Sequence, residues 1–132
     1  MDIIGERSLA DLLDAQAALH GEREFLVHDP LEGEVSALSF AGMRDAVAAM
    51  GAGLQAAGMG KGDRVFLFLR NTADYVPAWL GIMCAGGVAV PGNIYLTAPE
   101  VAFLLSDAQP AIVVTEARFL PLLEEAMATL AH

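Results

Sequence analysis

The stretch Gly62-Asp-Arg-Val-Phe-Leu-Phe-Leu-Arg-Asn71 decides the fold. Its centre, residues 64–69, is apolar after the first position, and consecutive side chains of an extended strand point alternately to its two faces. A strand that is apolar on both faces is typical of parallel sheets, which helices cover on each side. The preceding Lys61-Gly62-Asp63 has turn chemistry. We therefore expect a buried parallel strand here, flanked by helices.

Upstream of this strand, the spacing of apolar residues predicts an amphipathic helix. Ser39 is suited to cap it, and Gly58 lies where a left-handed residue ends a helix. Its inward stripe recurs at helical spacing and consists of Met43, Val47, Met50 and Leu54.

Downstream, helical and extended patterns continue to alternate. Asn71, Thr72 or Asp74 can cap a helix that ends near Gly86, and residues 88–90 form a short buried strand that Pro91 closes. Thr97-Ala-Pro-Glu100 is a capping box, and the helix that it opens ends at Pro110 with these residues inward: Val101, Leu104, Leu105 and Ala108. Residues 111–115 form another buried strand, and residues 116–130 are mostly helical. Such alternation predicts an α/β fold with a mainly parallel sheet.

The N-terminal part has a different pattern. Ser8 can cap a first helix, with Asp11 three residues on as an imperfect capping box. Gly21 suits its end, and its shared apolar face is expected to hold Leu9, Leu12, Leu13 and Leu19. Residues 25–28 and 35–38 look like two strands joined by a turn, which predicts a β-hairpin. We therefore divide residues 1–132 into a helix plus hairpin (1–40) and an α/β layer (41–132).

Composition excludes several classes of function. The net charge is −10, with one lysine and scattered arginines, so the chain lacks the basic patch that nucleic-acid binding requires. The single cysteine, Cys84, rules out an intramolecular disulfide and fits a reducing, cytoplasmic setting, where it serves as a packing residue. Residues 1–12 lack the pattern of a signal peptide. Residues 75–96 carry no charge, but their glycines and prolines favour a helix, a turn and a strand over a membrane span.

Three glycine patterns resemble nucleotide-binding motifs, and the first two fail on their context. Gly58-Met-Gly-Lys61-Gly follows a helix and opens a strand, the reverse of a phosphate loop. Gly51-Ala-Gly53-Leu-Gln-Ala56 lies inside a helix, where small residues indicate close packing. The pair Gly86-Gly87 fits a tight turn between helix and strand.

The remaining candidates for chemistry are also isolated. His20, His28 and His132 have no metal-ligand spacing with one another or with Cys84. No serine has the glycine frame of a hydrolase nucleophile. We therefore predict no catalytic, cofactor-binding or metal-binding residue in this chain.

From Leu38 onward the chain resembles the N-terminal segment of the AMP-forming acyl-CoA synthetases and adenylation domains, which activate carboxylates with ATP. Four short motifs carry the resemblance in order: Leu38-Ser39-Phe40, Gly62-Asp63-Arg64-Val65, Asn71-Thr72 and Cys84-Ala85-Gly86-Gly87-Val88-Ala89-Val90-Pro91. The chain departs from the family pattern at positions that we interpret as structural. Phe40 replaces a tyrosine, Gly42 a glutamate, Cys84 a lysine, and Gly92 an apolar residue.

The resemblance implies a two-step reaction in which a fatty or small carboxylic acid attacks ATP, giving an acyl-adenylate and pyrophosphate, and CoA then displaces AMP. In the family, the phosphate loop, the magnesium motif and the catalytic lysine lie downstream of this segment, and none occurs within residues 1–132. The resemblance thus implies an incomplete N-terminal part of a larger ligase domain, inactive alone. It implies that ATP, Mg²⁺ and CoA serve the full-length enzyme and that the partner is the remainder of the ligase domain. Self-association through exposed apolar surface is expected.

Two other interpretations stay open from the residues alone. The chain can be a self-sufficient, non-catalytic α/β binding or regulatory module. It can also be an unrelated flavodoxin-like or receiver-like domain, although a receiver needs clustered acids at its strand ends, and only Glu116 lies next to one. The acid that a parent ligase activates, the natural length of the chain and its oligomeric state are not encoded in any motif found here.

Overall fold

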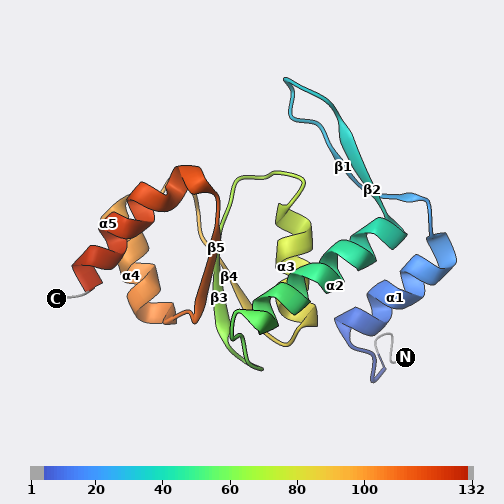
Figure 1. Ribbon diagram of the computed structural model, residues 1–132, viewed down its shortest axis with the longest axis horizontal. Helices are drawn as coiled ribbons and strands as arrows, with labels where there is room; N and C mark the ends of the chain where they lie inside the picture. Colours follow the sequence, from blue (N-terminus) through green and yellow to red (C-terminus); the bar gives the residue numbers. More distant parts are fainter. Residues whose placement is uncertain (1–4, 131–132) are drawn as a thin grey trace.

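A computed structural model describes residues 5–130 and shows an α/β fold (Figure 1). The elements follow one another in the predicted order: α1 (Leu9–His20), β1 (Glu24–His28), β2 (Ser36–Ser39), α2 (Phe40–Ala56), β3 (Arg64–Phe68), α3 (Tyr75–Cys84), β4 (Val88–Pro91), α4 (Ala98–Ala108), β5 (Ile112–Thr115), a 3₁₀ turn (Ala117–Phe119) and α5 (Leu120–Leu130). The alternation of helix and strand from α2 to α5 confirms the predicted fold class.

Three parallel strands form the main sheet, in the order β4-β3-β5. The strand read first from the sequence, β3, lies at the centre, with Phe66 opposite Val90 on one side and Val113 on the other. Its residues from Val65 to Phe68 are completely buried. The prediction of a parallel strand buried on both faces is confirmed.

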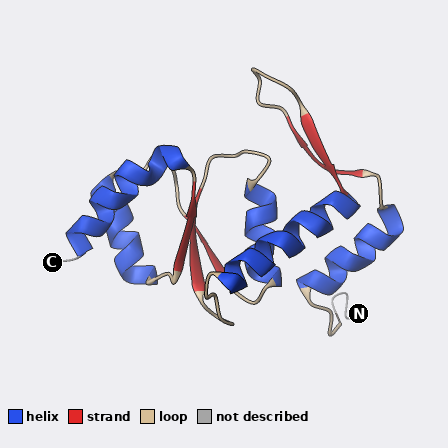
Figure 2. Ribbon diagram, viewed as in Figure 1, coloured by secondary structure: helices blue, strands red, loops and turns tan. Residues whose placement is uncertain are grey.

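Helices cover both faces of this sheet (Figure 2). Phe66 and Phe68 point to one face and pack against α4 and α5, whose Leu123 is also buried there. Val65 and Leu67 point to the other face and pack against α2 and α3. Burying each of these side chains stabilises the fold by about 1.5–3 kcal/mol relative to exposure. The centre of the sheet is therefore the main source of stability.

The N-terminal helix and hairpin form a third, smaller layer beside α2. The strands β1 and β2 pair antiparallel in a separate sheet, as predicted, and the hairpin projects away from the rest of the chain (Figure 1). Leu26 and Leu38 of the hairpin pack with Met43 and Val47 of α2. This layer is attached through α2 and not through the parallel sheet.

The predicted apolar face of α1 is wrong in three of its four leucines. Leu13 is buried, but Leu9, Leu12 and Leu19 are exposed, the last by 72%. The inward stripe is instead Leu13 and Ala17, one turn apart. This narrow stripe is sufficient because α1 packs chiefly against one neighbour, α2.

Local signals in the sequence set the helix ends. Ser8 and Asp11 form a complete capping box, in which the Ser8 N–H donates to the Asp11 carboxylate at 2.8 Å and the Asp11 N–H to the Ser8 hydroxyl at 3.2 Å. The predicted box of Thr97 and Glu100 is present as well. Gly58 and Gly86 have φ of +102° and +92°, the left-handed region that glycine adopts without strain.

The uncharged stretch 75–96 divides into a helix, a turn and a strand as the sequence predicts, but the strand is not buried as predicted, because it lies at the edge of the sheet and Val88 is 48% exposed. Its first part is α3, with Pro77 in the first turn, and its last part contains β4. Asp74 precedes α3 but makes no side-chain capping bond, so the expected polar cap is missing there. Within residues 5–130, no helix combines the length and the apolar character needed to cross a bilayer.

The residues of the apolar stripe on α2 are buried to different extents, and this difference gives a test of the core. Met43 is completely buried, whereas Met50, predicted as an equal member of the stripe, is only half-buried. We expect Met43→Asp to lower the free energy of unfolding by about 3 kcal/mol or more, because it buries a charge without a partner. Met50→Asp is expected to cost less, and Ala49→Asp, on the exposed side of α2, least. Urea unfolding measures all three, and equal midpoints for the Met43 and Ala49 variants would contradict this packing.

Candidate functional site

The carboxyl ends of the three parallel strands meet at one edge of the sheet. In open α/β sheets, ligands bind in the crevice outside this edge. Arg70 follows β3, Asn93 follows β4 and Glu116 follows β5, so the edge gathers polar side chains from all three strands. It is the candidate site that the topology selects.

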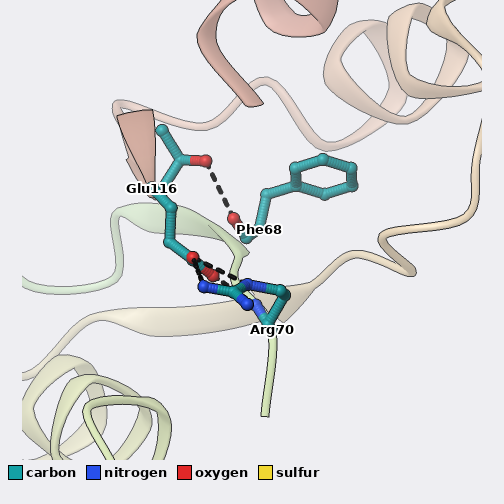
Figure 3. A network of polar contacts seen from close by, with 4 residues as sticks. Phe68, Arg70 and Glu116 are labelled. Carbon is teal, nitrogen blue, oxygen red and sulfur yellow. Dashed lines mark hydrogen bonds and ion pairs between the residues drawn. The ribbon is translucent and has the colours of Figure 1, made fainter. Parts of the chain in front are cut away.

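An ion pair between Arg70 and Glu116 closes one side of this edge (Figure 3). Nε and Nη2 of Arg70 donate to Oε2 of Glu116 at 2.9 and 2.7 Å, and the Arg70 backbone N–H donates to Oε1 at 2.8 Å. Next to this pair, the Thr115 hydroxyl donates to the Phe68 carbonyl at 2.8 Å. These bonds hold the end of β5 against the end of β3.

The pair also fixes the charge of both groups. The hydrogen bonds from Arg70 hold the pKa of Glu116 below its usual value, although partial burial opposes this shift. The same pairing raises the pKa of Arg70. Because each charge is already neutralised by the other, Arg70 is poorly placed to bind a phosphate group on its own.

A hollow of about 410 Å³ lies on the other side of Arg70, between the ends of β3 and β4. Asn71 and Asn93 line it, and the Asn93 side-chain oxygen accepts a hydrogen bond from the Tyr95 N–H at 3.0 Å. Tyr95 is 88% exposed. The hollow therefore offers amide and phenol groups, which suit neutral polar contacts more than a polyanion.

Gly92, at the floor of this edge, explains one departure from the family pattern. A Cβ atom at this position would lie 2.5 Å from Cζ of Phe66 and 2.9 Å from Cδ2 of Phe68. The rings of Phe66 and Phe68 are stacked, with centroids 5.6 Å apart, and they fill the space of an apolar side chain at position 92. The departure is structural, as expected.

The glycine patterns that resemble phosphate loops have structural roles, as predicted. Gly58 to Gly62 connect α2 to the amino end of β3, the opposite edge of the sheet. Their backbone donors are engaged, since the Gly62 N–H donates to the Gly86 carbonyl and the Gly60 N–H to the Asp63 carboxylate, both at 2.8 Å.

Close helix packing accounts for Gly51 of α2 but not for Gly53, which is exposed and has open space where a Cβ atom would lie. A Cβ atom on Gly51 would lie 3.0 Å from Cβ of Ala85, and one on Gly81 of α3 would lie 2.6 Å from Cγ of Met50. Gly51 and Gly81 thus let α2 and α3 approach each other. The predicted packing role is confirmed for Gly51 and is wrong for Gly53.

Within residues 5–130, Cys84, His20 and His28 form no metal-binding group. Cys84 is half-buried, and burial, reinforced by the charge of Asp14, raises the pKa of its thiol, which disfavours a nucleophilic thiolate. His20 packs against the ring of Phe40, with centroids 5.2 Å apart. His132 lies outside the described residues. Over residues 5–130, no group of three or more His, Cys, Asp or Glu side chains is arranged to hold a metal ion.

Comparison with known proteins identifies the family. The model of the AMP-binding enzyme family matches residues 13–132. The chain belongs to this family. This membership sets aside the unrelated flavodoxin-like or receiver-like fold.

The relatives include CoA ligases. The chain is 32% identical over 125 residues to crotonobetaine/carnitine–CoA ligase of Salmonella paratyphi B, a match that covers 95% of this chain and 24% of that protein. It is 30% identical to the solved N-terminal domain of FACL13 from Mycobacterium tuberculosis, with a TM-score of 0.79 over 93% of this chain and 29% of that one. O-succinylbenzoate CoA synthetase of Bacillus subtilis, solved with AMP, is 28% identical, with a TM-score of 0.77 over 88% of this chain and 29% of the other. The chain thus spans about a quarter of the length of the curated relative.

The pairing of Arg70 with Glu116 predicts an acid-dependent loss of stability. A carboxylate whose pKa is lower in the folded state stabilises the fold fully above its unfolded pKa of about 4.3, and this contribution is lost as the pH falls through the folded value. Glu116→Gln is therefore expected to lower the melting temperature at pH 7, and the difference from the parent should shrink as the pH falls through the lowered folded-state pKa and vanish once Glu116 is protonated in both states. Thermal melts from pH 2 to 7 measure this difference. The exposed Glu124→Gln serves as the control, and a difference at Glu116 that is constant with pH would contradict the role of the ion pair.

Proposed function

We propose that this chain forms the N-terminal structural part of an ATP-dependent, AMP-forming acid–CoA ligase. Such an enzyme converts a carboxylate, ATP and CoA into acyl-CoA, AMP and pyrophosphate. The observation that carries the proposal is the family match over residues 13–132, together with the resemblance to proteins named as CoA ligases. The acid that the enzyme activates is left open.

The described residues do not fit a site for ATP or Mg²⁺. Polyphosphate binding needs convergent cationic side chains and free backbone donors. Arg70 is paired with Glu116, and the N–H groups of Gly60 and Gly62 on either side of Lys61 already donate to the Asp63 carboxylate and the Gly86 carbonyl. The net charge of −10 also repels a polyanion. The segment therefore contributes a scaffold, and the groups that bind ATP, Mg²⁺ and CoA belong to the remainder of the ligase.

Within this scaffold, residues 1–40 and 41–132 have separate tasks. The α/β layer of 41–132 supplies the parallel sheet on which the larger domain is built. The helix and hairpin of 1–40 cover one end of α2, through Leu13 and Leu26. The partner is the remainder of the ligase domain, in the same chain or in a second polypeptide, and the enzyme works in the cytoplasm.

The proposal predicts that this chain alone neither forms an acyl-adenylate nor binds ATP with micromolar affinity. Calorimetric titration with Mg·ATP tests binding, and pyrophosphate release tests turnover with acetate, malonate, a medium-chain fatty acid and benzoate, each with CoA present. Intact crotonobetaine/carnitine–CoA ligase serves as the positive control, assayed with its own substrate. Lys61→Ala is the matched variant, because Lys61 lies in the glycine connector.

The outcome of these two assays distinguishes a scaffold within a ligase from a self-sufficient binding module. No signal from this chain, with activity on addition of the remainder of a ligase, supports the scaffold role. Micromolar ATP binding that Lys61→Ala abolishes would contradict it and favour a self-sufficient binding module.

Uncovered apolar surface predicts self-association of the chain when it is studied alone. Phe103 on α4 is 70% exposed, and it lines an apolar hollow with Leu96 and Pro99. Apolar surface of this kind promotes association. We expect a dimer or larger species at micromolar concentration by sedimentation, and binding of a hydrophobic dye. Phe103→Ser is expected to weaken both, and a clean monomer without dye binding would contradict the scaffold role.

A further inference from the structure

A hollow of about 280 Å³ lies between α1 and α2, apart from the carboxyl edge of the main sheet. The two helices lie side by side (Figure 1), and Leu13 and Val47, both buried, form part of the contact between them. The end of α3 closes the hollow with Cys84 and Ala85. Next to the contact, α2 leaves space because its lining residues are small, namely Ala48, Gly51 and Ala52. Ligand pockets usually measure about 300–1,000 Å³, so this hollow suits a small ligand.

The hollow contains a carboxylate without a partner. Asp14 of α1 contributes to the lining, and within residues 5–130 no hydrogen bond or ion pair engages its side chain. Burial, reinforced by the charge of Asp14, raises the pKa of the Cys84 thiol, which shows that the carboxylate lies within electrostatic reach of the thiol. The thiol is therefore neutral at pH 7 and does not compensate the charge of Asp14.

The other polar groups of the lining are engaged elsewhere. Arg44 is the one cation among the lining residues, and its Nε and Nη2 both donate to Oδ1 of Asp45 at 3.0 Å. The side-chain amide of Gln55 donates to the Ala85 carbonyl at 3.5 Å. Asp14 is thus the uncompensated charge of the hollow. The net charge of −10 adds a negative potential that attracts cations.

The lining favours an organic cation over a metal ion. Ca²⁺ and Mg²⁺ need several oxygen ligands, whereas Asp14 is the one carboxylate among the lining residues. Most of the other lining side chains are small and apolar, and they gain by contact with alkyl groups. A primary ammonium group is a compact point charge with three donors, which suits a single carboxylate.

We propose that the hollow between α1 and α2 binds the ammonium group and the alkyl chain of a primary amine, with Asp14 as the partner of the ammonium. The alkyl chain lies along the small side chains of α2, with Ala48 and Ala52 beside it. This site lies outside the ligase chemistry and does not depend on the proposed function. The same alkylammonium chemistry occurs in free amines and in the side chain of lysine, and the experiment below distinguishes these two sources.

Cys84 reports directly on the occupancy of the hollow, because it is the single cysteine of the chain and is half-buried in the lining. Its reaction with the neutral disulfide dithiodipyridine is followed at pH 7 with increasing n-butylammonium chloride. Amide NMR shifts of Asp14 and Ala52 follow the same titration. We expect saturable shifts and a reaction slowed by about threefold at a concentration of twice the Kd, because only the empty hollow reacts.

Two additives control for the separate contributions of alkyl chain and charge. n-Butanol has the same alkyl chain without the charge, and sodium chloride supplies the same ionic strength without the chain. We expect neither to slow the reaction of Cys84. Equal protection by n-butanol, or neither protection nor shifts with n-butylammonium, would overturn the proposal.

Charge variants test the role of Asp14. We expect Asp14→Asn to abolish the binding of n-butylammonium. Asp107→Asn, which removes an exposed carboxylate on α4, should leave it unchanged. Arg44→Gln removes a competing cation and should strengthen binding. Binding that survives in Asp14→Asn, or that is lost in Arg44→Gln, would show that the ligand is not held by the carboxylate and would overturn the assignment.

A tethered ammonium gives a test without added ligand. In Cys84→Lys the lysine side chain occupies the hollow and brings its ammonium group to Asp14, whereas Cys84→Met adds a chain without charge. We expect a higher Tm for the lysine variant than for the methionine variant, and no binding of n-butylammonium to the lysine variant. This difference in Tm should disappear when each variant also carries Asp14→Asn. A difference that is absent, or unchanged by Asp14→Asn, would overturn the pairing.

The last comparison separates the two sources of the ammonium group. Nα-acetyl-lysine amide carries the same ammonium and alkyl chain on a peptide backbone. A lower Kd for n-butylammonium assigns the site to a free amine, and a lower or equal Kd for the lysine derivative assigns it to a lysine side chain of another protein. Either result supports an alkylammonium site, and binding of neither probe overturns it.

Discussion

Every layer of this molecule depends on the complete burial of the central strand β3. Both faces of this strand are apolar, with Phe66 and Phe68 on one face and Val65 and Leu67 on the other. Exposing either face to water would raise the free energy of the folded state. Two layers of helices are therefore required, and the strands β4 and β5 satisfy the backbone groups on both sides of β3. Within one of these layers, α2 and α3 pack closely against each other because Gly51 and Gly81 leave room between the two helices.

The charged groups at the carboxyl edge of the sheet contribute to its structure and are not free to bind a ligand. Arg70, which could otherwise bind an anion at the carboxyl edge, is committed to the carboxylate of Glu116, and this ion pair holds β3 against β5. What the described residues form instead is a three-stranded sheet with helices packed on both faces.

Much of the fold could be predicted because its signals are local. The capping boxes at Ser8 and Thr97 bond within one turn, and the positive φ of Gly86 follows from its place after a helix. Which face of a helix is buried depends on residues that are more distant along the chain. The leucines of α1 were predicted to share one buried face, but Leu19 is exposed because the width of a buried stripe depends on how many neighbours a helix has. The candidate edge was missed for a similar reason, since Arg70 and Glu116 are 46 residues apart and carry no spacing signal.

The sequence by itself determined the order of the elements, the parallel character of the sheet, the structural role of the glycine patterns and the resemblance to the ligase family. These follow from periodicity, turn chemistry and short motifs, which act over a few residues. Only the tertiary structure decided which strand neighbours which, that the ring of Phe66 fills the space above Gly92, and that Arg70 pairs with Glu116. Such contacts join residues that are distant along the chain, and their partners are chosen by the shape and polarity of the whole assembly.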